Sequence, residues 1–203
     1  MKLVQALALS AGLLLPLSQA SAYTVSIWDR SPMTTLAQAD AAIASGAPTM
    51  SFHASVIEFD DLQDGTRGLF NINNPWGITP PETFAARVTG YFNIATAGTY
   101  TFGINHDDGA RLTINGSLTN AADGVVDNRT TTVTGTFAAG LHSVEIVYFE
   151  NSGGASLEFF GKAGTLGSTA PWALVTSAVP APGSLALAGL ALVGLGLVRR
   201  RRA

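Results

Sequence analysis

Two pairs of consecutive aspartates are the residues of this 203-residue chain best suited to chemistry. Asp107 and Asp108 precede Gly109, and Asp60 and Asp61 open the segment DDLQDG. Clustered carboxylates can hold a hard cation such as Ca²⁺, which takes about 6–8 oxygen ligands. Asp-Asp-Gly is also a favourable turn, because aspartate accepts backbone N–H bonds and glycine adopts a positive φ. Both interpretations stay open for the first pair, whereas the second lacks the downstream glutamate of an EF-hand and indicates a solvated loop.

Other kinds of site find little support. Adjacent aspartates on one turn do not provide the opposed acid and nucleophile that glycosidases hold about 5–10 Å apart. No G-x-S-x-G sequence of a serine hydrolase occurs, and the chain has no cysteine. His53, His106 and His142 have no metal-ligand spacing, which disfavours zinc. We therefore predict a binding protein and not an enzyme.

The first 22 residues have the composition of a secretory signal peptide. Lys2 is followed by an apolar stretch over 7–17, and the segment ends in a small-x-small sequence at Ala22. The interpretation predicts export through the Sec machinery, with residues 1–22 removed and Tyr23 as the first residue of the mature chain.

The other end of the chain combines an apolar run with a basic cluster. Residues 185–198 have no charged side chain and would form a helix of about 21 Å, which approaches a membrane span once 184 and its neighbours are added. Four arginines follow directly and would remain on the cytoplasmic side. The pattern predicts a transmembrane helix at about 184–198. On physical grounds alone, the role expected of this helix is that of a plain C-terminal membrane anchor.

The order of V-P-x-P, apolar helix and arginines resembles the PEP-CTERM sorting signal of Gram-negative bacteria. That resemblance implies cleavage by the membrane protease exosortase, after a transient stay in the inner membrane, and delivery to the cell surface or extracellular matrix. Ala181 stands where the commonest form has glutamate. The matching residues are Val179, Pro180, Pro182, Arg199, Arg200, Arg201 and Arg202.

The exported part of the chain is acidic. Of 11 basic residues, Lys2 and the four tail arginines are lost, so six remain against 14 acidic ones, a net charge of −8. This charge disfavours nucleic acid and anionic lipid head groups as partners.

Between the two ends, the pattern is mostly that of strands. Residues 34–45 predict one short helix capped by Thr35, and 60–81 read as a long loop. From Arg87 onward, turn residues recur every eight to twelve positions, as in a β-sandwich. The predicted strands are 51–59, 87–94, 99–104, 110–114, 130–137, 141–149 and 155–160. Alternation places five side chains in the core: Tyr100, Phe102, Ile146, Tyr148 and Phe160.

Several motifs in register resemble the PA14 domain, a lectin-like β-sandwich. They are R-x-x-G from Arg87, G-x-Y-x-F from Gly98, D-D-G-x-R-L from Asp107, N-G at Asn115 and A-G-x-H ending at His142. The resemblance covers 84–161 well and 23–59 loosely. It implies an all-β, PA14-type antiparallel sandwich with at most one short helix, over 23–162, flanked by the signal peptide and the C-terminal hydrophobic helix. A linker would occupy 163–178 and the sorting signal 179–203.

The resemblance also implies a site. In carbohydrate-binding members, two aspartates joined by a cis peptide coordinate Ca²⁺, and Asp107 and Asp108 match them. Asn151 matches a further ligand, and the carbonyl of Gly153 would complete the set. We expect Asp108→Asn to abolish most of the stabilisation by calcium while leaving the calcium-free stability nearly unchanged.

Loop residues of the same domain would determine which ligand binds. The expected carbohydrate contacts are Asp107, Asp108, Asn128 and Arg129. His142 is expected to bond backbone in the core, and Arg111 to brace a carboxylate in the sandwich.

The combined expectation is an exported protein that binds exopolysaccharide or cell-surface glycan with the help of Ca²⁺. The alternative is a non-catalytic structural or adhesive matrix protein whose sandwich makes protein contacts without binding sugar. Ice binding is disfavoured, because no flat threonine-rich repeat is present.

Overall fold

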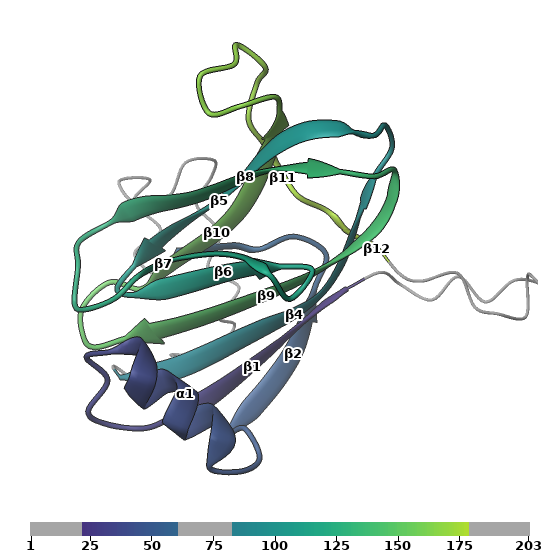
Figure 1. The fold of residues 1–203 in the computed structure, drawn as a ribbon. Helices are drawn as coiled ribbons and strands as arrows, with labels where there is room; N and C mark the ends of the chain where they lie inside the picture. The colour runs from purple at the N-terminus through teal and green to yellow at the C-terminus, as the bar shows by residue number, and fades with distance from the viewer. Residues whose placement is uncertain (1–21, 61–82, 179–203) are drawn as a thin grey trace, which may run out of the picture.

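The computed structural model describes residues 22–60 and 83–178, and these form two antiparallel sheets packed face to face (Figure 1). The predicted signal peptide up to residue 21, the sorting signal and Asp61 lie outside the described residues. Within the described ranges, no helix has the length and apolar character needed to cross a bilayer.

The first sheet has the strand order β2-β1-β4-β9-β6-β7, and β12 also pairs with β4. Its strands are β1 (Tyr23–Asp29), β2 (Met50–Ala54), β4 (Phe84–Ile94), β6 (Ala110–Ile114), β7 (Leu118–Ala122), β9 (Gly140–Glu150) and β12 (Ser177–Ala178). The second sheet has the order β11-β10-β5-β8, and β3 also pairs with β10. Its strands are β3 (Glu58–Asp60), β5 (Gly98–Asp107), β8 (Arg129–Phe137), β10 (Ser156–Ala163) and β11 (Ala173–Leu174). The predicted all-β sandwich is confirmed.

Alternate side chains of both sheets fill the space between them. Phe102, Ile146 and Tyr148 are buried there as predicted, while Tyr100 is half-buried at the margin of the core. Phe160 is fully buried but is not part of this core, because its neighbour Phe159 occupies the inward position of β10. Both faces of β10 are covered, so burial alone does not reveal which residues point inward.

Among the described residues there is one helix, α1 (Leu36–Ala44), and it covers part of the outer face of the first sheet (Figure 1). Its cap is Thr35, as predicted, whose hydroxyl accepts a hydrogen bond from Gln38 N at 3.3 Å. Three small or apolar residues one helical turn apart, Leu36, Ala39 and Ala42, are buried. They belong to a second apolar cluster that also contains Trp28, Ala85, Val147 and Phe149.

Residues 163–178, expected to be a linker, instead pack on the sandwich. The Lys162 ammonium donates to the carbonyls of Leu166 (2.6 Å) and Ser168 (2.8 Å), and it lies 4.6 Å from the Trp172 ring centre. Further along, β11 pairs with β10 and β12 pairs with β4. Small, polar composition disguised this segment, because many of its contacts are made by the backbone, and few of its side chains, such as Trp172 against Phe160 and Val175 against the core, are large and apolar.

Candidate functional site

The aspartate pair lies at one end of the sandwich, where β5 turns into β6. Asp107 is the last residue of β5, and the Asp107–Asp108 peptide bond is cis. Gly109 follows, and a Cβ atom there would lie 2.3 Å from Phe149 Cε1. Glycine is therefore required for close packing, and not for the positive φ that the sequence suggested, since Gly109 is absent from the positive-φ glycines of the described chain.

Three carboxylates converge at this turn. One side-chain oxygen each from Asp107, Asp108 and Glu150 lie within 4.8 Å of one another, and all three residues are buried. We call these residues the carboxylate cluster. Glu150 is not among the site residues that the sequence motifs predict. Strand periodicity could have identified it, because Ile146 and Tyr148 point into the core and Glu150 follows with the same parity on β9.

Asp108 connects three loops through its carboxylate. Its Oδ1 accepts a hydrogen bond from Val126 N at 3.0 Å, and its Oδ2 accepts one from Asn151 N at 2.8 Å. A carboxylate oxygen can accept more than one interaction, so these two bonds are compatible with a role in binding. The residue thus has a structural role in addition to any role in binding.

Tyr148 and His106 support the cluster from the core. The Tyr148 hydroxyl is bonded to Glu150 Oε2 (2.7 Å) and to the main-chain oxygen of Asp107. Burial, reinforced by the Glu150 charge, raises the pKa of Tyr148 well above its usual range, so its proton is retained. Beside it, His106 Nδ1 donates to the Asp108 carbonyl at 2.5 Å and Nε2 accepts from the Thr131 hydroxyl at 2.9 Å. Burial lowers the pKa of His106, which favours the neutral imidazole. The bond to the Asp108 carbonyl places the proton of that neutral ring on Nδ1.

The other expected ligand residues surround the cluster without all joining it. Asn151 is half-buried and contacts Asp108 through its backbone N–H, while its side-chain amide lies 3.5 Å from Ser152 Oγ. Gly153 is exposed with a φ of 97°. Asn128 and Arg129 are exposed at the start of β8, where Arg129 pairs with His106 of β5. The structure therefore brings Asp107 and Asp108 together with Glu150 and puts Asn151 next to them.

Asp60, from the second aspartate pair, is the last residue of β3. It pairs with Ser156 of β10, which pairs on its other side with Asp107 of β5.

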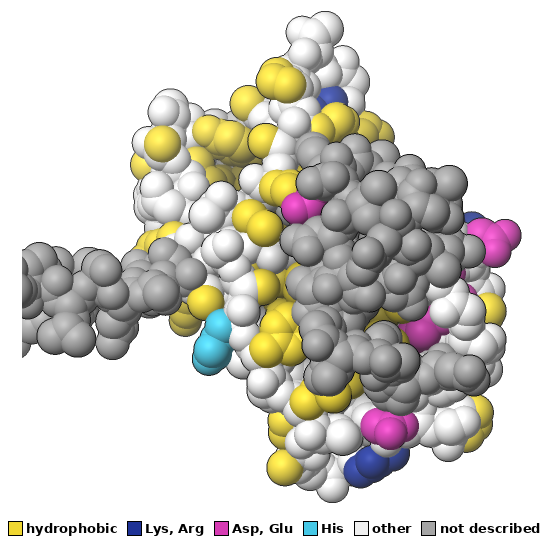
Figure 2. Space-filling view, turned by 180° about the vertical axis from the view of Figure 1, so that it is seen from behind, with side chains coloured by type: hydrophobic (Ala, Val, Ile, Leu, Met, Phe, Trp, Pro, Cys, Tyr) yellow, Lys and Arg dark blue, Asp and Glu magenta, His cyan; other side chains and the backbone are white. Residues whose placement is uncertain are grey.

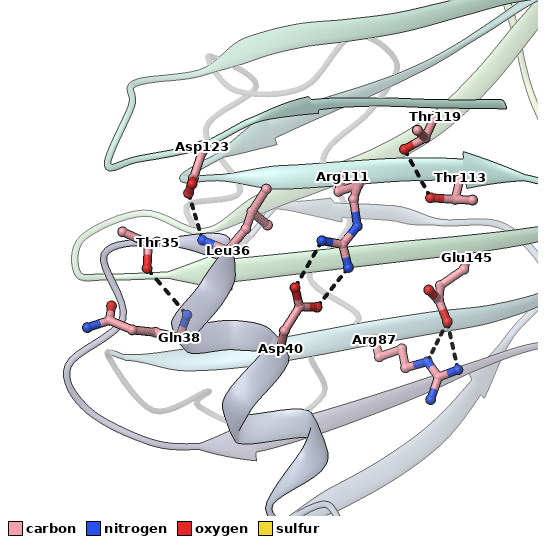
Figure 3. Close-up of polar contacts among 10 residues, drawn as sticks. All are labelled: Thr35, Leu36, Gln38, Asp40, Arg87, Arg111, Thr113, Thr119, Asp123 and Glu145. Carbon is pink, nitrogen blue, oxygen red and sulfur yellow. Dashed lines mark hydrogen bonds and ion pairs between the residues drawn. The ribbon is translucent and has the colours of Figure 1, made fainter. Parts of the chain in front are cut away.

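Two structural predictions have different outcomes. His142 bonds backbone in the core as expected, with Nε2 donating to Ala138 O at 2.9 Å. Arg111 does brace a carboxylate, but its partner is Asp40 of α1, held at 2.7 and 3.0 Å on the outer face of the sheet (Figure 3). The PA14-like motifs begin after the helix, so they could not identify Asp40 as this partner.

Asp123 joins the helix to the loop beside the site. Its Oδ1 accepts a hydrogen bond from Leu36 N at the start of α1, at 2.6 Å (Figure 3). The same loop supplies Val126 N to Asp108. The helix and the carboxylate cluster therefore hold the 123–126 loop from opposite sides.

Comparison with known proteins identifies two segments. The PA14 domain family matches residues 74–173, and the PEP-CTERM protein-sorting motif matches residues 178–202. No curated protein matches the chain.

Solved structures with the same fold include two PA14 domains and one adhesin domain. The PA14 domain of the MpAFP antifreeze protein is 19% identical, with 76% of this chain and 89% of that chain covered and a TM-score of 0.58. The PA14 sugar-binding domain from an RTX adhesin is 21% identical, with 78% and 99% covered and a TM-score of 0.55. The Epithelial Adhesin 9 A domain from Candida glabrata, in complex with Galβ1-4GlcNAc, is 9% identical, with 76% and 90% covered and a TM-score of 0.52.

At these identities the structural likeness establishes the fold alone. The family match spans the turn after β5, the end of β9 and the loop that follows it, where the carboxylate cluster and Asn151 lie. Fold and family agree, and the chain is a PA14-domain protein that carries a C-terminal PEP-CTERM protein-sorting motif.

Proposed function

We propose that this protein is exported to the cell surface or extracellular matrix of a Gram-negative bacterium and binds carbohydrate there without catalysing a reaction. The observation that carries the proposal is the carboxylate cluster, with three buried acidic residues at one end of a PA14 sandwich. Similar folds include a sugar-binding domain and an adhesin domain solved with a disaccharide, which supports a ligand of this class.

Calcium is the proposed cofactor, and the donor chemistry fits it. The carboxylate oxygens lie within 4.8 Å of one another, and at that separation two ionised carboxylates would repel by roughly 3–4 kcal/mol at an effective dielectric constant of about 20. A divalent cation offsets that repulsion, and an all-oxygen donor set suits Ca²⁺. Asp107, Asp108 and Glu150 would hold the ion, with Asn151 and the Gly153 carbonyl adjacent. The bound ion would supply an electropositive centre for sugar hydroxyls, and His106 is excluded as a ligand because hydrogen bonds occupy both its ring nitrogens.

Exposed polar side chains at the rim would complete the sugar site. Asn128 and Arg129 offer amide and guanidinium donors, which bond hydroxyl oxygens well. The ligand would be an exopolysaccharide or a cell-surface glycan. Export would use the signal peptide and Sec machinery, followed by exosortase processing at the sorting motif.

A second candidate is a structural matrix protein that makes protein contacts without binding sugar. The observation that favours it is the double backbone bonding of Asp108, which gives the aspartate pair a purpose independent of any ligand.

A glycan array with and without a chelator tests the proposal. The purified protein should bind a subset of glycans in millimolar Ca²⁺ and lose that binding in EDTA. Asp107→Asn should lose it in both buffers. Asp127→Asn, which removes the same charge from an exposed position near this end, should bind like the parent. Binding that ignores EDTA would contradict the calcium step, and an array without any bound glycan would favour the structural candidate.

A further inference from the structure

The chain leaves the sandwich at a fixed place. β12 ends at Ala178, opposite Tyr91 of β4, while β1 pairs with the same side of β4 from Thr24, opposite Thr89. A Cβ atom on the intervening Gly90 would lie 3.4 Å from the Cα of Tyr23, so β1 already occupies the next position. The next position along β4 is therefore taken by β1, and Ala178 is the last residue that this segment can pair with β4.

The carboxylate cluster lies at the opposite end of the same strand. Phe84 begins β4 and pairs with Glu150, seven residues from Tyr91. At about 3.3 Å per residue, roughly 23 Å of strand separates the point of exit from the cluster. We call the two ends of the sandwich the exit end (residues 91–98, 137–143 and 163–178) and the site end (residues 107–109, 123–128 and 150–154).

The two ends differ in charge. The segments of the exit end contain no Asp, Glu, Lys or Arg of their own, and among the described residues the cation placed against them is the buried ammonium of Lys162, bonded to the carbonyls of Leu166 and Ser168. This end exposes Tyr91 (44%), Leu141 (40%) and Leu166 (56%). The site end contains five acidic residues: Asp107, Asp108, Asp123, Asp127 and Glu150. On the face shown in Figure 2, the visible acidic side chains (magenta) lie over the centre, right and lower parts of the molecule.

We propose that, while the tail is held in the membrane, the exit end faces the phospholipid surface and the site end points away from it. The inference rests on the proposed function, which supplies the membrane-held tail and the sugar site. A tyrosine and two leucines suit the interface between water and lipid, where amphipathic and apolar side chains are enriched. The exit end has no acidic side chain and so meets no repulsion from lipid phosphates, whereas the acidic site end does.

The length of the tether enforces the same orientation. Seven Cα steps separate Ala178 from Leu185, where the apolar run begins, and they reach at most about 25 Å. The lipid head groups take up roughly 5–7 Å of that reach. The reach that remains is shorter than the ~23 Å between Ala178 and the carboxylate cluster. If the site end lay on the bilayer, Ala178 would be too far from the membrane surface for this segment to span the distance. The tethered protein therefore presents its sugar site outward before processing.

Single-cysteine labelling of the full chain tests the orientation, because the sequence has no cysteine of its own. Leu141→Cys and Ser152→Cys place a fluorophore at the two ends of β9, both at exposed positions. Leu166→Cys and Val125→Cys provide a second pair, exposed at the exit end and the site end. Each labelled protein is reconstituted in phosphatidylethanolamine–phosphatidylglycerol vesicles that contain lipids with a quencher on the head group.

We expect the quencher to reduce emission severalfold more at positions 141 and 166 than at 152 and 125. Equal quenching at both ends, stronger quenching at the site end, or no quenching at any position would each overturn the proposal. Thermal melts of the four labelled proteins that match those of the parent would show that all four have the same fold, so that differences in quenching report position alone. The quenching experiment requires neither calcium nor sugar. The orientation proposal can therefore be contradicted while the glycan array supports the proposed function, and the orientation can be supported while the array shows no binding.

Discussion

At the scale of single residues, Asp108 combines two roles that the sequence could not separate. The aspartate pair and its cis peptide bond were predicted from the motif, and the structure contains both. The backbone donors Val126 N and Asn151 N were not predictable, because they come from loops 18 and 43 residues away along the chain. Glu150 was predictable from strand parity but was not assigned.

Asp108→Asn should therefore destabilise the fold even without calcium, contrary to the expectation from sequence. Both carboxylate oxygens of Asp108 accept a backbone N–H, but an asparagine has only one side-chain oxygen. Its NH₂ group would face the other backbone N–H, which would lose its acceptor, and an unsatisfied buried donor costs about 1–3 kcal/mol. Denaturant unfolding in EDTA measures the loss. Asp127→Asn, an exposed control, should stay within about 0.5 kcal/mol of the parent. Equal stability of the two variants would mean that the Asp108 bonds contribute nothing net.

Calcium should stabilise the folded protein through the carboxylate cluster. At a calcium concentration of 100 times the dissociation constant, preferential binding to the native state adds about 2.7 kcal/mol. Thermal melts in millimolar Ca²⁺ and in EDTA measure this gain, and Asp107→Asn should remove most of it. Identical melts of the parent protein in the two buffers would show that the cluster does not bind calcium.

At the scale of strands, the core depends on the alternating residues of β9. Ile146 is fully buried between the sheets, so Ile146→Ala should cost about 2–5 kcal/mol of unfolding free energy. Ser143→Ala, on the outer face of the same strand, should cost less than about 0.5 kcal/mol. Denaturant titrations of both variants test which face of β9 points into the core. A loss of unfolding free energy under about 0.5 kcal/mol for Ile146→Ala would show that the strand faces are assigned wrongly.

Strand periodicity predicted most of the second half of the fold but not its connections. The region 51–59, read as one strand, is two strands, β2 and β3, in different sheets. Alternation of apolar residues does not reveal a change of sheet, which depends on partners distant in sequence. For the same reason the pairing of β12 with β4 was not predictable from a Gly- and Ser-rich segment.

At the scale of the whole molecule, sorting and binding occupy separate parts of the chain. Replacing Arg199–Arg202 with glutamine should leave the protein trapped or mislocalised, because the positive cluster sets the orientation of the apolar run. Fractionation and immunoblotting in an exosortase-bearing host measure the outcome. Lysine at the same four positions keeps the charge and should preserve membrane orientation. A glutamine variant that is trimmed and reaches the surface like the parent would contradict the sorting proposal.

The adjacent positions of Tyr23 and Ala178 on β4 have a consequence for how the domain can be combined with others. Because its first and last residues meet, the sandwich can be inserted into a surface loop of another protein with both junctions at one point. A short peptide that joins the two residues would likewise permit circular permutation, with new ends opened at the exposed Asn115–Ser117 turn between β6 and β7. The fold is thus a self-contained module whose strand order does not depend on where its chain begins.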